Sequence, residues 1–312
     1  MPWEPVNVAL DYRLGEIPLF SRRFSGYANK LHFSRMEAYR RLPDEHVADS
    51  PQSRFFFYPT YPVAFEPPRI ARQRDWIAYT PYTFNNHYID IAAIGNFEAY
   101  VAGFSSKTRA TLLRKVRKFA VAGGGTVDCR EFATAHDMAA FFPLARSVSA
   151  KTYQERLLDS GLPHNDAFMA RACDLADRGG CLGYILFMNG VPAAYMLSFC
   201  KDGVLTYDHV GYDPALKALS PGTVLQFEAL KAIFSKDWIT MFDFTEGEGE
   251  QKRLFGRACE RCAKTYFLHR SVPNELAIRL HAALGDGVTI VGRALDAIGA
   301  KALVRRFVRR VA

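Results

Sequence analysis

The residues best suited to chemistry lie together in one stretch, residues 204–225. Alternating β-branched and aromatic residues predict a strand, which ends at Pro214 because proline lacks an N–H donor. Ser220 and Pro221 predict the start of an apolar helix, where unpaired N–H groups and the helix dipole attract anions. The candidate phosphate ligands of this turn are Lys217, Ser220, Gly222, Thr223 and Val224. The alternative is a helix start that binds nothing.

Motifs of several other reaction types are missing from the sequence. There is no G-x-S-x-G, no H-E-x-x-H and no Walker loop, so a covalent enzyme intermediate has no support. Cys259 and Cys262 form a lone C-x-x-C, whereas a zinc site needs a second pair of ligands. We therefore expect structural cysteines and no metal.

Composition limits the partners without choosing among them. The 312 residues are 49% hydrophobic and carry a net charge of +8, which suits a coenzyme, a nucleic acid or a membrane surface. No apolar run approaches the roughly 18–20 residues of a membrane span, and the N-terminus lacks the features of a signal peptide. Six scattered cysteines do not indicate a disulfide framework. We expect a cytoplasmic protein, with peripheral attachment at the inner face of the membrane as an alternative.

The elements around residues 204–225 divide the chain into three predicted parts. Residues 1–94 form an aromatic-rich lobe with a helix at 29–42 and short strands at 54–58, 62–65, 75–79 and 88–91. We expect its aromatic residues to form a core and not a substrate groove. Residues 95–270 form the main domain, and residues 271–312 form a basic helical tail.

The main domain has a regular order of predicted elements. Helices are predicted at 96–101, 105–122, 134–151, 165–178, 220–234 and 250–255, and strands at 126–132, 181–188, 192–200, 204–210, 240–244 and 264–269. The resulting order from residue 126 onward is β-α-α-β-β-β-α-β-α-β. The strand at 204–210 therefore directly precedes the candidate phosphate turn.

Two predicted helices are strongly basic. Residues 107–118 contain six cations, which form either a solvated face or a surface that attracts a polyanionic ligand. Residues 301–312 combine an apolar face with five cations, which predicts either packing on the protein or docking to an anionic membrane or partner.

This order of elements resembles the GNAT acyltransferase fold, in which the same loop holds the pyrophosphate of coenzyme A. Residues 88–270 further resemble the CelD-like branch of that family, which is related to the FemAB aminoacyl transferases. The motifs that carry the resemblance are residues 149–154, 212–214, 219–225, 243–248 and 251–256. In the loop, Lys217 and Ser220 replace the family's Arg or Gln and Gly, and Pro221 removes one N–H donor.

The resemblance implies an α/β (α+β) fold, with a mixed, mostly antiparallel sheet flanked by helices. The N-terminal lobe could then be a degenerate half of the same fold. The acyl group would lie between strands 204–210 and 240–244, which splay apart in the family. The implied catalytic candidates are His209, Asp208 and Glu246 as bases and Tyr207 or Tyr266 as acid. The implied substrate-binding candidates are Glu248, Lys252 and Tyr153.

His209 is the preferred base, because the pKa of imidazole lies nearest to neutral pH. Strand alternation puts Asp208 and His209 on opposite faces, so one of them at most faces the acceptor easily.

The resemblance therefore implies transfer of an acyl group, such as acetyl, from acyl-CoA to an amine or hydroxyl of a small molecule, sugar or peptide. One alternative is an aminoacyl-tRNA donor, whose backbone the helix at 107–118 would contact. A second alternative is a non-catalytic partner in envelope polysaccharide or lipid assembly, held at the membrane by residues 301–312. We expect no DNA partner.

Overall fold

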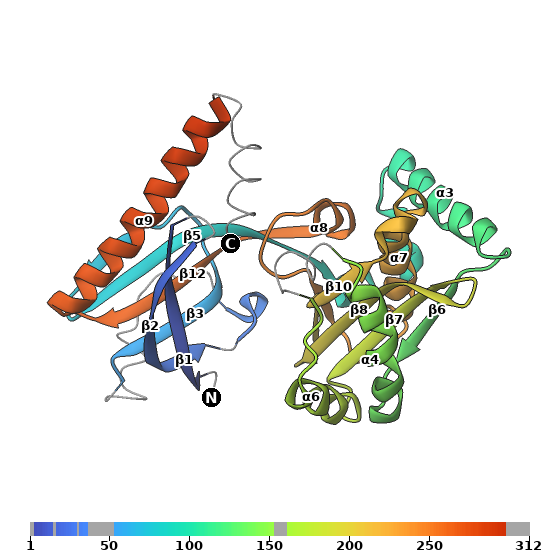
Figure 1. The fold of residues 1–312 in the computed structure, drawn as a ribbon, viewed down its shortest axis with the longest axis horizontal. Coiled ribbons are helices and arrows are strands. Elements are labelled where there is room, and N and C mark those ends of the chain that lie inside the picture. Colours follow the sequence, from blue (N-terminus) through green and yellow to red (C-terminus); the bar gives the residue numbers. More distant parts are fainter. Residues whose placement is uncertain (1–2, 15–16, 30, 37–52, 153–160, 298–312) are drawn as a thin grey trace. The chain divides into compact units, whose positions relative to one another are not determined.

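The computed structural model describes residues 3–14, 17–29, 31–36, 53–152 and 161–297, with the side chains of Arg35 and of 287–297 excepted. The chain forms two compact units, residues 1–85 with 261–312, and residues 86–260. Figure 1 shows the elements of each unit, which are described separately below. Within the described residues, no helix combines the length and hydrophobicity needed to cross a bilayer.

The first unit is built on long strands. Its elements are β1 (Trp3–Leu14), β2 (Ile17–Asn29), η1 (Phe33–Arg35), β3 (Phe55–Pro62), β4 (Ile70–Gln73), the first part of β5 (Trp76–Asp90), most of β12 (Ala258–His269) and α9 (Val272–Ala297). β1 pairs antiparallel with β2, β2 pairs parallel with β3, and β3 pairs antiparallel with β12. The predicted aromatic core is confirmed, because Phe55, Phe56 and Tyr79 are almost fully buried.

Some predictions for this unit were wrong. The expected helix at 29–42 is replaced by the end of β2 and the short η1, and residues 37–42 lie outside the described part. The strand expected at 54–58 is β3, which continues through Pro59 to Pro62, whereas residues 63–65 of the strand expected at 62–65 are not in a strand. β1 and β2 were not predicted. Each is stabilised by pairing, and β1 also by α9, where Tyr12 Oη donates to the carbonyl of Ala277 (3.1 Å).

The second unit agrees closely with the predicted order. Its helices are α1 (Ile91–Ile94), α2 (Phe97–Ala102), α3 (Ser106–Ala122), α4 (Ala135–Ser149), α6 (Asp166–Ala176), η3 (Pro214–Leu219), α7 (Pro221–Ile233) and α8 (Glu250–Phe255). Its strands are β6 (Asp128–Phe132), β7 (Cys181–Met188), β8 (Val191–Lys201), β9 (Val204–Thr206), β10 (His209–Tyr212) and β11 (Met241–Asp243), with the end of β5. Here the sheet order is β5-β11-β9-β8-β7-β6, and only β9 and β11 are parallel. The predicted mixed, mostly antiparallel fold is confirmed.

Helices cover both faces of the β7–β8 sheet (Figure 1). Leu182, Tyr184 and Leu186 of β7 pack with α3 and α7, whereas the alternate residues Cys181 and Ile185 pack with α4 and α6. This alternation is the two-residue period of a strand that is buried on both sides. The sheet therefore fixes where α7 lies, and with it the turn that precedes the helix.

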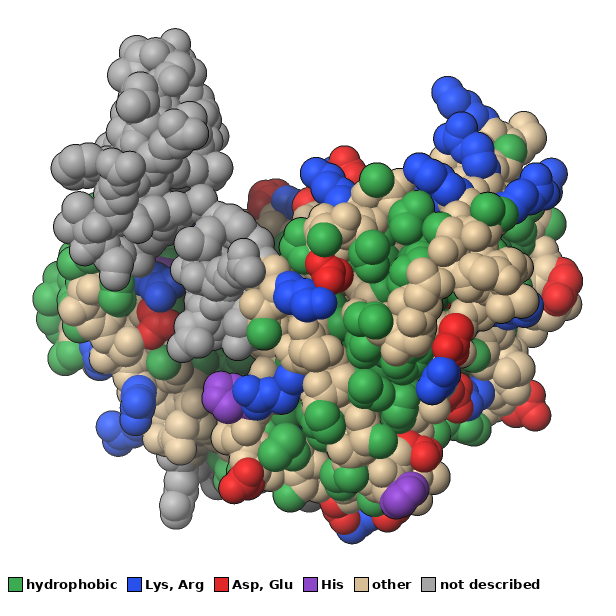
Figure 2. Space-filling model, turned by 45° about the vertical axis from the view of Figure 1, so that its right-hand side comes forward, with side chains coloured by type: hydrophobic (Ala, Val, Ile, Leu, Met, Phe, Trp, Pro, Cys, Tyr) green, Lys and Arg blue, Asp and Glu red, His purple; other side chains and the backbone are tan. Residues whose placement is uncertain are grey.

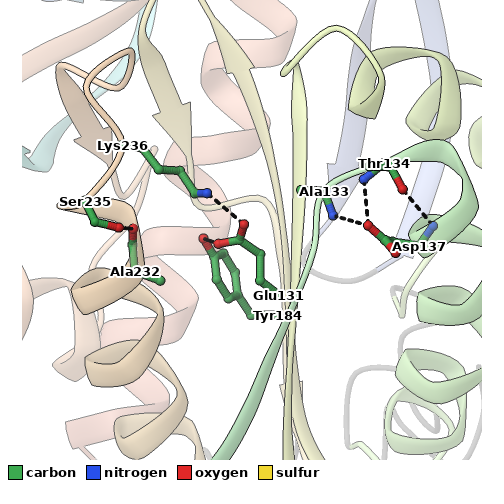
Figure 3. Close-up of polar contacts among 8 residues, drawn as sticks. All are labelled: Glu131, Ala133, Thr134, Asp137, Tyr184, Ala232, Ser235 and Lys236. Atoms are coloured by element: carbon green, nitrogen blue, oxygen red, sulfur yellow. Dashed lines mark hydrogen bonds and ion pairs between the residues drawn. The ribbon is translucent and has the colours of Figure 1, made fainter.

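Local capping explains the boundaries of several helices in this unit. The side chains of Asn96, Ser105, Thr134 and Asn165 each accept a backbone N–H of the first turn that follows. Thr134 forms a full capping box, because Asp137 also accepts the N–H of Thr134 (3.1 Å) (Figure 3). The sequence predicted these starts because caps act over three residues.

The strand predicted at 204–210 is interrupted by a β-bulge. Leu205 faces Cys200 on β8, but His209 faces Leu197, so four steps on one strand match three on the other. Asp208 compensates for the lost pairing, since its Oδ2 accepts the N–H of Phe199 (3.0 Å). β9 pairs with both β8 and β11, whereas β10 pairs with β8. β11 ends at Asp243, so the sheet opens beyond the bulge.

The far end of α7 is held to the sheet by three polar side chains (Figure 3). Lys236, just after the helix, donates to Glu131 Oε1 on β6 (2.7 Å), and Tyr184 Oη donates to Glu131 Oε2 (2.8 Å). Tyr184 is 1% exposed, and its burial raises the pKa of its hydroxyl. Hydrogen bonds to charged groups are stronger than those between neutral groups, so this cluster fixes the position of α7.

We predict that Tyr184→Phe lowers the free energy of unfolding by about 1–2 kcal/mol, because Glu131 loses a hydrogen bond from a buried donor. Urea unfolding would measure the loss. Ser235→Ala is the control, because Ser235 makes only an exposed bond to the Ala232 carbonyl (Figure 3) and its loss should cost under about 0.5 kcal/mol. Equal effects of the two substitutions would contradict the anchoring role.

Candidate functional site

A cavity of about 690 Å³ lies in the second unit where α7 begins. Its walls come from β8, the bulge, β10, η3, the first turns of α7 and the start of α8. Predicted site residues on its wall are Tyr207, Lys217, Ser220, Gly222 and Thr223. The further polar wall residues that sequence reasoning missed include Gln226 and Gln251. The cavity therefore joins the predicted phosphate turn to the point where the sheet opens.

Ser220 does not cap α7 as the sequence predicted. It has a left-handed backbone (φ 55°, ψ 48°), and its side chain makes no capping hydrogen bond. A side chain disfavours this conformation, which explains why glycine is usual here in the related family. The Ser220 hydroxyl is therefore available at the cavity wall, while its backbone stores strain.

The backbone donors of this turn differ from those expected. The N–H groups of Thr223 and Val224 both donate to the Ser220 carbonyl, at 3.0 and 3.1 Å. Pro221 has no N–H, and Val224 is fully buried. The N–H of Gly222 is therefore the best-placed backbone donor, and a Cβ built there would meet only the Tyr212 ring, at 3.5 Å.

The loop before α7 is held by two cations from other helices. Lys151, just after α4, pairs with Asp213 (2.8 Å), and Asp213 also accepts the N–H of Ala215 at the start of η3 (3.0 Å). Lys118 of α3 donates to the carbonyl of Ala218 (3.0 Å). These contacts fix the backbone on both sides of Lys217, whose own side chain lines the cavity.

Polar side chains from α7 and α8 form a cluster on the cavity wall, here called the amide cluster: Thr223, Gln226 and Gln251. Gln251 Nε2 donates to Thr223 Oγ1 (3.1 Å). Gln226 is 1% exposed, yet its Nε2 has no hydrogen-bond partner among the described residues, and neither does the buried Oε1 of Gln251. Burying such atoms unpaired is costly, so they favour a ligand that both donates and accepts hydrogen bonds. A glutamine on the buried face of an apolar helix was the signal in the sequence.

The predicted acid and bases lie in different places around the bulge. Tyr207 lines the cavity, its ring lies 5.5 Å from that of Phe244, and burial raises its pKa to about 12. Asp208 accepts the N–H of Phe199 at the bulge, and burial raises the pKa of its carboxyl. The His209 ring packs edge-on to Phe168 (5.3 Å), and burial lowers its pKa. Asp208 and His209 are not among the described residues that line the cavity.

The remaining predicted residues lie mostly in the loop after β11. Lys252 donates to the carbonyls of Thr245 (3.2 Å) and Glu246 (2.6 Å), and burial lowers its pKa. Glu248 lies 3.7 Å from His87 Nε2 and 3.5 Å from Arg253. The structure thus uses Lys252 and Glu248 to hold the loop, outside the described cavity wall.

Four other residues that the sequence analysis named do not line the cavity in the described part of the structure. Tyr153 lies outside the described residues. Tyr266 belongs to the first unit, where its ring lies 4.9 Å from Phe57. Cys259 is exposed and Cys262 is buried, and no group of three His, Cys, Asp or Glu residues in the described part could hold a metal ion.

Comparison with known families supports this fold. Residues 106–253 match the family model of the acetyltransferase (GNAT) domain. Over this segment the chain is similar to a GNAT-type acetyltransferase domain, which agrees with the predicted resemblance to that family. The matched segment includes α3, the bulge, α7 and most of α8, and so contains every residue of the cavity wall named above.

Solved structures with similar folds are all distant in sequence. A C-terminal domain (DUF2156) of a putative lysylphosphatidylglycerol synthetase from Agrobacterium fabrum is 10% identical, with 77% of this chain and 75% of that chain covered and a TM-score of 0.48. FemX is 12% identical, with 88% and 90% covered and a TM-score of 0.48. No curated protein matches the sequence. Likenesses this distant do not bear on the substrate.

We predict that Ser220→Gly raises the free energy of unfolding by about 1 kcal/mol, because glycine adopts φ 55° without steric cost. Ser220→Ala is the control, since it keeps the Cβ and removes only the hydroxyl. Chemical denaturation would measure both variants. If the glycine and alanine variants lose stability equally, the hydroxyl that both lack must cap the helix, which would contradict this prediction.

The Asp213–Lys151 pair predicts a pH dependence of stability. The Lys151 ammonium lowers the pKa of Asp213 in the folded state, so this pair stabilises the protein above the unfolded pKa of about 3.9. The contribution is lost as pH falls through the lower folded pKa. We expect Asp213→Asn to be destabilising at pH 7 and the difference from the unsubstituted protein to shrink below about pH 4. A difference that is constant with pH would contradict this pairing.

Proposed function

We propose that the second unit transfers an acyl group from a coenzyme A thioester to an amine or hydroxyl acceptor. The observation that carries this proposal is the cavity, which extends from a helix N-terminus to the bulge where the sheet opens, inside an acetyltransferase (GNAT) domain. Acyl transfer needs an anchored donor, a polarised carbonyl and a proton for the leaving thiolate. The wall residues suit the anchoring of the donor and the supply of a proton to the leaving thiolate.

The helix end of the cavity suits a phosphate group. Gly222 offers its N–H and close backbone approach, the Ser220 hydroxyl can donate, and Lys217 supplies a cation. The positive end of the α7 dipole adds to this field. Lys217 would act as a point charge on a flexible stem.

The middle of the cavity suits the amide-containing arm that joins the phosphates of coenzyme A to its sulfur. Gln226 lies four residues after Gly222, about 6 Å further along α7. An amide of the arm would accept from Gln226 Nε2 and donate to Gln251 Oε1, two buried atoms that have no partner in the described part of the chain. The terminal amides of glutamine turn easily, so small rotations can bring these covered atoms to the ligand.

The bulge end of the cavity suits the reacting thioester. A tyrosine hydroxyl is neutral at physiological pH, and burial raises the pKa of Tyr207 further, to about 12, so its hydroxyl can donate a hydrogen bond to the carbonyl oxygen or the departing sulfur. The base stays a prediction, since His209, Asp208 and Glu246 all lie off the described cavity wall. The acceptor, whether small molecule, sugar or peptide, and the cytoplasmic location also stay predictions.

A second candidate donor is aminoacyl-tRNA, which the exposed cations of α3 favour. Four of them, Lys107, Arg114, Arg117 and Lys118, are exposed. A nucleic-acid donor would make activity fall steeply with salt concentration. The non-catalytic alternative, a partner in envelope assembly, depends on residues 301–312, which lie outside the described residues.

We predict that acetyl-CoA binds the protein and that Lys217→Ala weakens binding by about 1–3 kcal/mol, the value of a charge-assisted hydrogen bond. Gly222→Val should abolish binding, because its side chain would block approach to the N–H. Lys231→Ala is the matched control, since it removes an exposed cation from the last turn of the same helix. Isothermal titration calorimetry would measure all four proteins.

Two results would count against the proposed donor. The first is an unmodified protein that binds neither acetyl-CoA nor longer acyl-CoAs at millimolar concentration. The second is an equal loss of affinity in Lys217→Ala and Lys231→Ala, because general charge and not a site at the start of α7 would then explain binding.

A further inference from the structure

Helix α3 carries an unusual concentration of positive charge. Its residues Ser106–Ala122 include six cations and no Asp or Glu. Four of the six are exposed, namely Lys107, Arg114, Arg117 and Lys118, here called the basic face. Among the described residues, no ion pair involves any of these four. Unbalanced like charges repel one another, so the basic face suits an anionic partner.

The basic face leads directly to the cavity. Lys118 donates to the carbonyl of Ala218, the neighbour of the cavity residue Lys217. Figure 2 shows Lys and Arg side chains gathered on the projecting upper right edge, the region of α3 in Figure 1. A partner on this face would therefore lie beside the phosphate end of the cavity.

The basic face is longer than one coenzyme phosphate needs. Lys107 and Lys118 are eleven residues apart, which is about 16 Å along the helix axis. The turn at α7 also has few donors, because the N–H groups of Thr223 and Val224 bond to Ser220. One phosphate fits this turn better than a pyrophosphate, and the remaining cations need a larger acidic surface.

Apolar residues on the same helix indicate the kind of partner. Leu113 is 44% exposed and Val121 is 73% exposed, and they lie among the cations. Arginine beside apolar side chains is typical of protein interfaces, whereas a nucleic-acid backbone offers no apolar partner. The main apolar stripe of α3 is buried, with Leu112 and Phe119 in the core, so it cannot insert into a bilayer.

We propose that the basic face of α3 docks a small acidic protein that carries the acyl group on a phosphate-linked thiol arm. The arm enters the cavity beside Lys118 and Lys217 and places its amides at the amide cluster. An acceptor amine then attacks the thioester carbonyl, the C–N bond forms and the C–S bond breaks. The proton lost by the amine ends on sulfur, which leaves a free thiol on the carrier. This inference rests on the proposed acyl transfer and names the form in which the donor arrives.

The test compares two donors with the same arm. The probes are acetyl-CoA and a purified acidic acyl carrier protein whose phosphopantetheine arm is acetylated. Arg114→Glu with Arg117→Glu should weaken carrier binding by at least about tenfold, and carrier binding should not become more dependent on salt concentration. The affinity for acetyl-CoA should change by less than about twofold. Arg178→Glu with Lys231→Glu is the control, because it makes the same change of net charge at exposed sites elsewhere in the unit.

Several outcomes would overturn the docking surface. One is carrier binding that the reversal on α3 leaves unchanged, or that the control pair weakens equally. Another is an unmodified protein that binds acetyl-CoA but not the carrier, which overturns docking and leaves the proposed function intact. A third outcome is an unmodified protein that does not bind the carrier but binds tRNA, or vesicles containing phosphatidylglycerol. If the α3 variant loses that binding, the basic face belongs to that partner instead. Failure of both donors to bind would reject the proposed function itself.

Discussion

The bulge between β9 and β10 is the feature on which the rest of the second unit depends. It inserts one extra residue opposite β8, and the Asp208 carboxylate takes the N–H of Phe199 that the lost pairing exposes. Without that bond, the N–H of Phe199 would lose its hydrogen bond to the Asp208 carboxylate. Because the bulge ends pairing with β11, it creates the opening in which the cavity lies.

The start of α7 shows how a binding site can cost stability. Ser220 holds a left-handed backbone, and the amide cluster buries two polar atoms for which the described residues offer no hydrogen-bond partner. Both features oppose folding, yet the apolar contacts of α7 and the cluster around Glu131 keep the helix in place. Strain and unpaired polar atoms at one cavity are the pattern expected of a binding site.

Charge is distributed unevenly over the second unit. Some cations elsewhere in the unit have acidic partners, as in the pairs Lys151–Asp213 and Lys236–Glu131. Helix α3 has no acidic residue of its own, although it packs beside the loop that leads to α7. Alternating positive and negative side chains stabilise a solvated surface helix. A helix that carries only positive charges is therefore better explained by binding to a partner than by its own stability.

The sequence by itself determined the features that depend on near neighbours along the chain. Thr134, Ser105 and Asn165 mark helix starts because a cap acts within three residues, and the strand at 181–188 has the bounds that its apolar run predicted. The site turn was also visible, because proline at the first helical position and glycine after it are local signals.

Only the tertiary structure decided what depends on contacts between distant residues. The bulge needs Phe199 of β8 opposite Asp208, the left-handed Ser220 follows from a loop held by Lys118 and Lys151, and β1 is defined by its pairing with β2. The amide cluster likewise joins α7 to α8, 28 residues apart. Pairing across such separations is set by packing and not by local preference, which is why the sequence indicated the family and the turn but not the cavity wall.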